Sequence, residues 1–499
     1  MEDTCLSAEN NIANLEQPPL LKRAVRKTGE TVVGLGKAIS QFFIGVVKSV
    51  ATLLTDLGTA VIKGDWATRL SLFIMGFYGF VRGQVARGAA YLTVQLIYIF
   101  YMFTTGFEML SKFSTLGTVT QGKVFDEEQG IYIYTAGDNS MQILLFGTTT
   151  IIITLIFIAV WASSVRAAYR VQLNRENGEH IIGLKDDIKS LVGKNYHITL
   201  LTPPVLLVGI FTVLPLVFMT LMAFTNYDKS HQPPGNLFTW VGLDNFTNLF
   251  GGNEKISYTF VNLLAWTLIW AIFATFSNYI LGMILALMIN KKGIKFKKMW
   301  RLIFIITIAV PQFVTLMLMS QLLHDQGAIN VLLQQLGITT ESIGFLSNST
   351  LARISVIVVN MWIGIPYSML ITSGILMNIP EDLYEAARID GANPVQTFFK
   401  ITLPYMLFVT TPYLITQFVG NINNFNVIFL LTGGGPLTLD YYQAGKTDLL
   451  VTWLYKQTVN EQNYNLAAVI AIVVFIITAS MSLIVYNNSS ATKKEDQFS

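Results

Sequence analysis

Polar side chains at helical spacing interrupt two of the most apolar stretches of the chain. In the stretch 351–377, Asn360, Gly364 and Tyr367 are spaced i, i+4 and i+7 and therefore share one face of a helix. In the stretch 404–431, three amide residues show the same spacing: Gln417, Asn421 and Asn424. Amides in an apolar medium need hydrogen-bond partners. They therefore either bond to neighbouring helices or line a site for a ligand that carries hydroxyl groups.

A second group of residues lies in the polar segment 378–403, which joins these two stretches. Glu381, the first of two acidic residues after a proline, favours a helix N-terminus. Gly391 ends this helix or allows a sharp turn, and Pro394 can open the next one. The segment is therefore predicted to form a short helix–turn–helix, with Pro404 starting the helix that follows.

Catalytic and cofactor-binding patterns are missing from the sequence. The apolar stretches contain no Asp or Glu, no HExxH occurs, and no serine follows a glycine by two positions. Ala444–Thr447 resembles the end of a phosphate-binding loop, but Asp440 stands where that motif needs its first glycine. With the single cysteine Cys5, no disulfide or metal site is expected. We predict neither an enzyme nor a cofactor or nucleic acid partner.

The composition shows what must hold these residues in place. Charged residues make up 13% of the 499, apolar residues 52%, and the mean hydropathy is +0.52. This is typical of a polytopic membrane protein. Eight apolar stretches are long enough to cross a bilayer as helices: 88–106, 143–163, 200–222, 258–289, 302–322, 351–377, 404–431 and 465–486.

The distribution of Lys and Arg predicts how these helices are oriented. If the N-terminus is cytoplasmic, most of the 33 Lys and Arg residues lie on the inner side. The short loop 290–301 alone holds six: Lys291, Lys292, Lys295, Lys297, Lys298 and Arg301. Both termini are therefore predicted to be cytoplasmic, as is the segment 378–403.

Residues 1–87 are predicted to form a cytoplasmic N-terminal region. Within it, apolar residues at helical spacing over 31–62 predict an amphipathic helix. This helix lies on the inner membrane surface or packs against the protein's own cytoplasmic loops. The apolar stretch 70–81 is too short to span and is predicted to be interfacial or re-entrant.

The segment 378–403 resembles the EAA motif of binding-protein-dependent ABC importers. Seven residues fall in register with it: Glu385, Ala386, Ala387, Gly391, Ile401, Leu403 and Pro404. In that family the loop forms a coupling helix that docks into the ATPase subunit. The resemblance implies that five residues couple the chain to an ATPase: Glu385, Ala386, Ala387, Asp390 and Gly391. Small residues suit this role because they let two backbones approach closely.

The stretch 200–490 is similar to the maltose-type (MalF-like) membrane subunit of carbohydrate importers. The resemblance is carried by the segments 360–367, 398–404, 421–425, 431–436 and 444–450. It implies an all-α membrane protein with a six-helix type I ABC importer (MetI-like) core at 200–490, preceded by two accessory transmembrane helices at 88–163. It also implies a sugar site formed by Asn360, Ile363, Gly364, Tyr367, Gln417, Asn421 and Asn424.

Two departures from this family pattern stand out. The loop 223–257 is too short to form the large outer domain that the maltose-type relative carries there. Gln417 replaces a smaller hydroxylic residue, which would reshape the sugar site.

The resemblance implies a permease subunit in the bacterial plasma membrane that imports maltose or maltodextrins. The expected partners are membrane lipid, a second EAA-type permease in a heterodimer, two copies of an ABC ATPase that hydrolyse the ATP, and an extracellular solute-binding protein. Two alternatives stay open. One is an ABC permease for another oligosaccharide, of the raffinose or multiple-sugar type. The other is an ion-coupled secondary carrier, against which the lack of intramembrane carboxylates counts.

Overall fold

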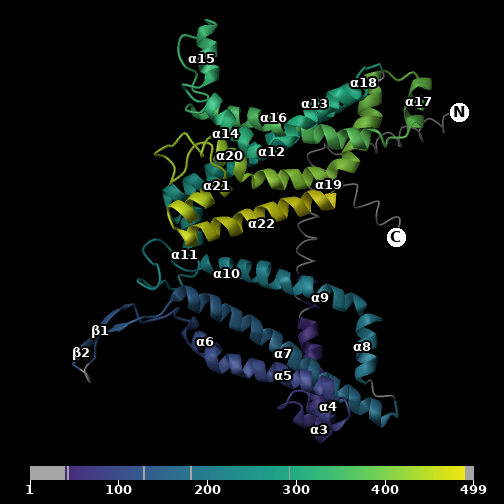
Figure 1. Ribbon diagram of the computed structural model, residues 1–499, viewed down its shortest axis with the longest axis vertical. Coiled ribbons are helices and arrows are strands. Elements are labelled where there is room, and N and C mark those ends of the chain that lie inside the picture. The colour runs from purple at the N-terminus through teal and green to yellow at the C-terminus, as the bar shows by residue number, and fades with distance from the viewer. Residues whose placement is uncertain are drawn as a thin grey trace, which may run out of the picture. The chain divides into compact units, whose positions relative to one another are not determined.

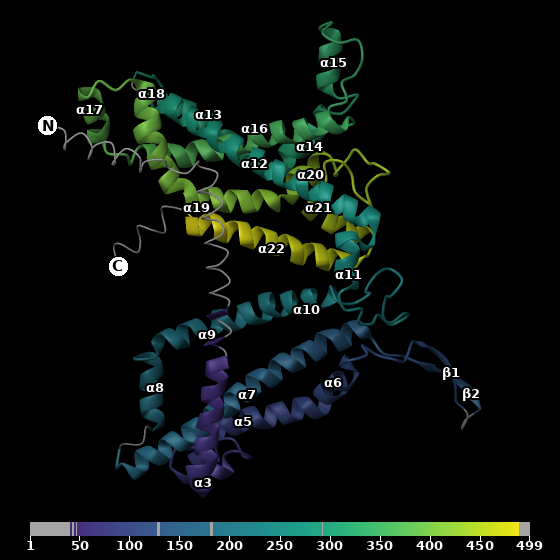
Figure 2. The same cartoon turned by 180° about the vertical axis from the view of Figure 1, so that it is seen from behind.

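The computed structural model describes residues 40, 41, 44, 45, 47–126, 130–179, 183–291 and 293–488. In this part of the chain nearly all regular structure is helical (Figures 1 and 2). The described residues fall into two compact units. One contains Tyr258–Trp453 and the described part of Val473–Ser499, and the other contains Ile44–Ser257 and Leu454–Ile472.

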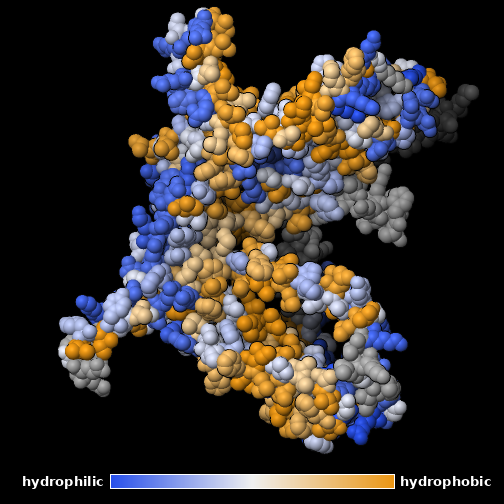
Figure 3. Space-filling view, viewed as in Figure 1, coloured by the Kyte–Doolittle hydropathy of each residue, from blue (hydrophilic) through white to orange (hydrophobic). Residues whose placement is uncertain are grey.

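The predicted set of about eight membrane-length helices is confirmed. Among the described residues, seven helices are long and apolar enough to span a bilayer: Val85–Phe113, Ser140–Glu176, Tyr196–Met222, Glu254–Asn290, Ser349–Leu376, Pro394–Ile422 and Tyr464–Tyr486. The number is eight when α13 (Lys297–Ala309) and α14 (Gln312–Leu322), which are bent by 85° to each other, are counted together as one span. Hydrophobic side chains cover much of the surface over α5 (Val85–Tyr101) and α7 (Ser140–Glu176), as expected of surfaces that face lipid (Figure 3).

The unit that includes Ile44–Ser257 is built on α7. The helices α5 and α6 (Phe107–Phe113), joined by the π-helical turn η1 (Met102–Gly106), pack along it. The short helices α3 (Trp66–Leu70) and α4 (Phe77–Val81) precede them. This unit also contains α8 (Leu184–Val192), α9 (Tyr196–Val208), η2 (Gly209–Val213), α10 (Leu214–Met222), α11 (Asp244–Thr247), η3 (Asn248–Gly252) and η5 (Lys456–Asn460).

The unit that includes Tyr258–Trp453 is built on two long helices, α12 (Glu254–Asn290) and α16 (Ser349–Leu376). Around them the chain forms α13, α14, α15 (Ala328–Gln335), α17 (Glu381–Ile389), α18 (Pro394–Thr397), η4 (Phe398–Thr402), α19 (Leu403–Ile422), α20 (Phe425–Leu431) and the first part of α21 (Leu450–Tyr455). The helix α22 (Tyr464–Asn488) belongs to this unit from Val473 onward. The helix α14 packs against α16 and α20, and α16 packs against α19.

Two predicted spans are interrupted. The stretch 404–431 is not one helix, because α19 ends at Ile422 and α20 begins at Phe425. Between them Asn424 caps α20, its side-chain oxygen accepting the backbone N–H of Val427 at 3.2 Å. The bend in the stretch 302–322 falls at Val310, which is extended (φ −76°, ψ 126°) because Pro311 follows it.

Pro404 lies in the first turn of the α-helix α19, as predicted. The helical run itself begins ten residues earlier, at Pro394, and continues through η4 into α19. Proline lacks the N–H of a regular helical bond. The π-helical turn η4 directly precedes it, so the irregular hydrogen bonding and the proline occur together.

The N-terminal prediction is covered only in part, since residues 31–39, 42, 43 and 46 lie outside the described residues. Residues 47–63 are helical. Asp56 of this helix forms an ion pair with Arg166 of α7 at 3.0 Å, and the Gln172 amide donates to the Lys63 carbonyl at 3.3 Å. These contacts favour packing on the protein itself. The stretch 70–81 contains the end of α3, a turn and α4.

A β-hairpin between α6 and α7 was not predicted. Its strands β1 (Gly122–Asp126) and β2 (Ile131–Thr135) are antiparallel. The Asp138 carboxylate anchors the base of this loop by accepting the backbone N–H groups of Thr118 and Val119 at 2.9 and 3.0 Å. The bond from Thr118 is the main cause that lowers the pKa of Asp138, and Lys112 at 3.0 Å adds to it.

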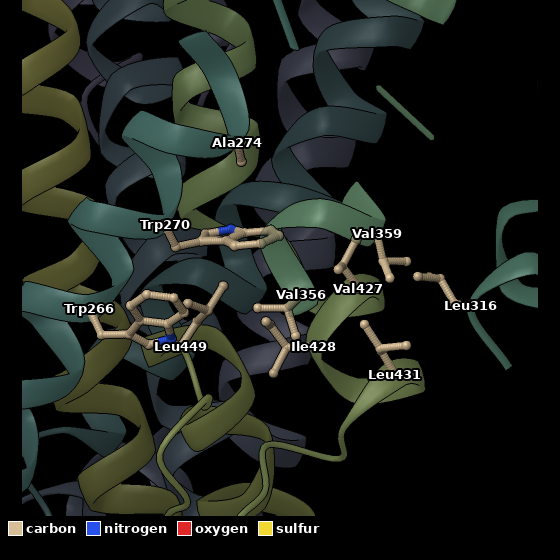
Figure 4. Packing of buried hydrophobic residues seen from close by; sticks show 10 residues of the cluster. All are labelled: Trp266, Trp270, Ala274, Leu316, Val356, Val359, Val427, Ile428, Leu431 and Leu449. Atoms are coloured by element: carbon tan, nitrogen blue, oxygen red, sulfur yellow. The ribbon is translucent and has the colours of Figure 1, made fainter. Parts of the chain in front are cut away.

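The helices α12 and α16 approach each other closely. A side-chain carbon added at Gly282 of α12 would lie 2.5 Å from Ser368 Cβ and 2.8 Å from the Met369 backbone nitrogen of α16. Next to this approach lies a cluster of buried apolar residues, drawn in Figure 4: Trp266, Trp270, Ala274, Leu316, Val356, Val359, Val427, Ile428, Leu431 and Leu449. The cluster ties α14 and α20 to the two long helices.

We predict that Gly282→Leu separates α12 from α16. The new side chain would overlap backbone atoms of α16, and overpacking of this kind costs about 1–3 kcal/mol. Thermal unfolding of the detergent-solubilised protein should show a lower midpoint. Gly374→Leu is the matched control, because a side-chain carbon at Gly374 of α16 meets nothing within 4 Å. Equal midpoints for the two variants would contradict the prediction.

Candidate functional site

A polar cavity of about 330 Å³ lies between α12, α16 and α19. All seven residues expected from the sequence to form a binding site line it: Asn360, Ile363, Gly364, Tyr367, Gln417, Asn421 and Asn424. They come from α16, from α19 and from the residue that caps α20. Helical spacing makes the residues of α16 share one face and those of α19 share another, and both faces line the cavity. The structure therefore brings the two predicted faces together.

The sequence reasoning missed the third wall of this cavity, which α12 provides. Thr275, Asn278 and Tyr279 lie on it. With Gly282 they form a face of polar and small residues at i, i+3, i+4 and i+7, the same signal that marked the other two helices. Gln312, Ser368 and Tyr413 also line the cavity. Gln312 is the first residue of α14 and thus brings the bent span to the site.

Two of the predicted amides are hydrogen-bonded within the protein. The Asn421 amide donates to the Thr275 hydroxyl of α12 at 3.0 Å, and the Asn421 backbone carbonyl accepts from the Trp270 indole at 3.0 Å. The Asn424 amide donates to the Asn421 side-chain oxygen at 3.4 Å. These bonds join α12 to the end of α19. Asn421 and Asn424 therefore have a packing role whatever else they do.

Gly364 gives the neighbouring helix room. A side-chain carbon at this position would overlap the amide group of Asn278. The Asn278 side chain of α12 can therefore lie directly on the backbone of α16 only because residue 364 is glycine. By contrast, Tyr367 is 48% exposed, so its ring is available to the cavity.

Apolar packing bounds the cavity at both ends. Along α12, the cluster of Figure 4 ends at Ala274, and the polar residues Thr275 and Asn278 follow. Beyond them a second apolar cluster begins: Tyr279, Met283, Ile379 and Met406. The hydroxyl of Tyr279 still bonds to that of Thr410 on α19 at 2.7 Å. The polar groups thus occupy one level between two apolar layers.

The segment 378–403 folds as predicted into a helix, a turn and a second helix. Glu381 and Asp382 lie in the first turn of α17, where the helix dipole favours acidic groups. The chain turns at Gly391, whose φ is +72°, and Asn393 caps α18 by accepting the Gln396 backbone N–H at 2.8 Å. This helix–turn–helix leads directly into α19.

The five residues expected to couple to an ATPase do not share one surface. Glu385, Ala386, Asp390 and Gly391 are exposed, whereas Ala387 is buried. Ala387 lies on the inner face of α17, where Tyr384 bonds to Thr402 at 3.1 Å. Its small size therefore serves the contact between α17 and the start of the next span. The other four residues form an exposed edge.

The amides of α19 lead to a stability prediction. Asn421→Leu should destabilise the protein by about 1 kcal/mol, because it removes the hydrogen bond to Thr275 and leaves that hydroxyl without it. Gln417→Leu, one turn away on the same helix, removes no such hydrogen bond to another described residue and should leave the unfolding midpoint unchanged. Thermal unfolding of both variants in the same detergent tests this. If Gln417→Leu lowered the unfolding midpoint more than Asn421→Leu, the packing role would belong to Gln417 and the prediction would be wrong.

Comparison with known proteins supplies the family. Residues 278–494 match the family model described as "Binding-protein-dependent transport system inner membrane component". The chain is 36% identical over 360 residues to the galactooligosaccharides transport system permease protein GanP of Bacillus subtilis (strain 168), an alignment that covers 72% of this chain and 85% of GanP. It is 34% identical over 424 residues to the maltodextrin transport system permease protein MalC of Streptococcus pneumoniae, covering 83% and 93% of the two chains.

A second comparison concerns the fold. A chain from the crystal structure of a bacterial ABC transporter involved in the import of the acidic polysaccharide alginate superimposes with a TM-score of 0.51 and 23% identity. The match covers 60% of this chain and 97% of that one, and it shows that both share the fold of an importer permease. The shared fold agrees with the sequence identity to GanP and MalC, which extends over most of the chain. The chain is a multi-pass membrane protein that belongs to the family of MalF-like permease subunits of binding-protein-dependent ABC importers.

Proposed function

We propose that this permease carries neutral oligosaccharides of the maltodextrin type across the plasma membrane of a bacterial cell. One observation carries the proposal: the residues that two helices were expected to contribute to a sugar site line a single polar cavity. The relative MalC is a maltodextrin transport system permease protein, which supports the maltodextrin class. The family relationship supports transport as the activity.

The chemistry of the cavity fits a sugar. Amides such as Asn360 and Gln417 donate to and accept from hydroxyl groups, and the ring of Tyr367 offers a face to the apolar side of a pyranose. The described residues of its lining include no Asp, Glu, Lys or Arg. A neutral, hydroxyl-rich ligand matches such a lining better than an ion does.

Galactooligosaccharides are a second candidate substrate class. GanP is the relative that favours them, at 36% identity over 360 residues. Gln417 is relevant here, because a long amide in place of a small hydroxylic residue changes the shape of the cavity. Competition of unlabelled galactooligosaccharides against labelled maltotriose uptake separates the two classes.

The assembly that we propose is a heterodimer with a second EAA-type permease on two ATPase subunits, fed by an extracellular binding protein. Glu385, Ala386, Asp390 and Gly391 form the exposed edge that would meet the ATPase, with Ala387 supporting them from behind. ATP hydrolysis belongs to the ATPase subunits. Both termini lie in the cytoplasm in this arrangement.

The division of the chain follows the same scheme. We propose that 1–87 is a cytoplasmic region, that 88–163 supplies two accessory transmembrane helices, and that 200–490 is the importer core with its coupling loop at 378–403. The short loop 223–257 leaves the contact with the binding protein to other outer segments.

The sugar site is tested by Asn360→Leu combined with Gln417→Leu. Losing the hydrogen bonds of two amides should lower maltotriose uptake about a hundredfold, since each bond changes affinity about tenfold. The complex should still assemble and hydrolyse ATP when its binding protein is added. Uptake is measured in proteoliposomes that contain the full complex. Wild-type uptake of every oligosaccharide length in this variant would refute the site.

The coupling loop is tested at Gly391. Because its φ is positive and no neighbour crowds it, Gly391→Asn should be tolerated, as Asn adopts this conformation more easily than other side chains. Gly391→Trp adds both strain and bulk on the exposed edge. It should abolish sugar-dependent ATP hydrolysis in a complex that still inserts into the membrane. Transport at the wild-type rate by the Trp variant would remove the loop from the proposed interface.

A further inference from the structure

Two buried polar atoms in the cavity have no hydrogen-bond partner among the described residues. One is Oδ1 of Asn278 on α12, and the other is Nδ2 of Asn360 on α16. The two side chains are only 9% and 5% exposed. A buried polar atom left without a hydrogen bond is unfavourable, so native proteins rarely keep one without a reason. Here two occur in one cavity.

The two atoms are complementary and belong to the neighbouring helices α12 and α16. Asn278 rests on Gly364, which is one helical turn from Asn360 on α16. Oδ1 of Asn278 can only accept a hydrogen bond, and Nδ2 of Asn360 can only donate one. A ligand that satisfies both must supply a donor to Asn278 and an acceptor to Asn360.

We propose that Asn278 is a specificity-determining residue of the permease. Its Oδ1 accepts a hydrogen bond from a substrate hydroxyl, while Nδ2 of Asn360 donates to an oxygen of the same or the adjacent hydroxyl. The proposal rests on the proposed function and adds α12 to the two helices already expected to hold the sugar. No covalent step is involved.

This pairing selects for neutral sugars that carry a free hydroxyl at that position. A sugar hydroxyl donates and accepts, so two adjacent hydroxyls of a pyranose satisfy both amides. A carboxylate offers only acceptors, so it would leave Oδ1 of Asn278 without a hydrogen bond. Its negative charge would also face the partial negative charge of that oxygen. Oligosaccharides with a uronate at this position are therefore rejected. A sugar that lacks the hydroxyl donating to Asn278 is disfavoured for the same reason, because it leaves Oδ1 of Asn278 unpaired.

The experiment uses the full complex in proteoliposomes, with its binding protein and ATP. Uptake of maltotriose is compared with uptake of each of its monodeoxy analogues, in the wild type and in Asn278→Leu. The binding protein is the same in both complexes, so comparing each sugar's uptake rate between the variant and the wild type removes the binding protein's own selectivity. Asn262→Leu is the control, since Asn262 lies on α12 outside the cavity and, among the described residues, its side chain bonds to the Tyr258 carbonyl.

In the wild type, we expect one analogue to be imported about tenfold more slowly than maltotriose, the effect of one hydrogen bond. In Asn278→Leu, maltotriose and that one analogue should be imported at nearly equal rates. The rates of the other analogues relative to maltotriose should stay as in the wild type. Asn262→Leu should keep every ratio. Asn278→Ser, which is too small to crowd Gly364, should repeat the result if the Leu variant does not assemble.

Three outcomes count against the proposal. Equal slowing of all the sugars by Asn278→Leu and Asn278→Ser would assign Asn278 to helix packing. Unchanged ratios in both variants would remove it from the site. Failure of the wild-type complex to import any neutral oligosaccharide would refute the proposed function itself, which is a different result from the other two.

Discussion

The close contact between α12 and α16 is the constraint on which the rest of the structure depends. It requires a residue without a side chain at two levels, Gly282 against Ser368 and Gly364 against Asn278. Because the two backbones are this close, the polar face of α12 meets the polar face of α16 instead of lipid. The apolar cluster then holds α14 and α20 against the same pair. The position of the cavity follows from this contact.

Much of the site could be predicted from the sequence because helical spacing is a local property. Asn360, Gly364 and Tyr367 had to share a face once α16 was a helix, and the same holds for α19. The wall on α12 was missed because its face mixes threonine, tyrosine and a single amide over a long apolar helix. Spacing also says nothing of which amide is paired: the partner of Asn421 is Thr275, 146 positions earlier in the chain.

The fold was predicted less well where helices break. Hydropathy averaged over about 20 residues sees the apolar character of 302–322 and 404–431 but not their interruptions. Both breaks carry a local signal, Pro311 in one and the capping residue Asn424 in the other. The hairpin of β1 and β2 lies in a loop that hydropathy treats only as polar. Such details depend on single residues, whereas the count of spans depends on composition.

The apolar layers on either side of the cavity have a consequence for the membrane as a whole. A cell that stores energy in ion gradients cannot tolerate a continuous column of water through a transport protein. A hydrated proton or sodium ion that followed α12 would have to lose its water among Trp266, Trp270 and Leu316 on one side, and among Met283 and Met406 on the other. The packing that stabilises these helices therefore also opposes the passage of small ions along α12, although a polar cavity lies between the two apolar layers.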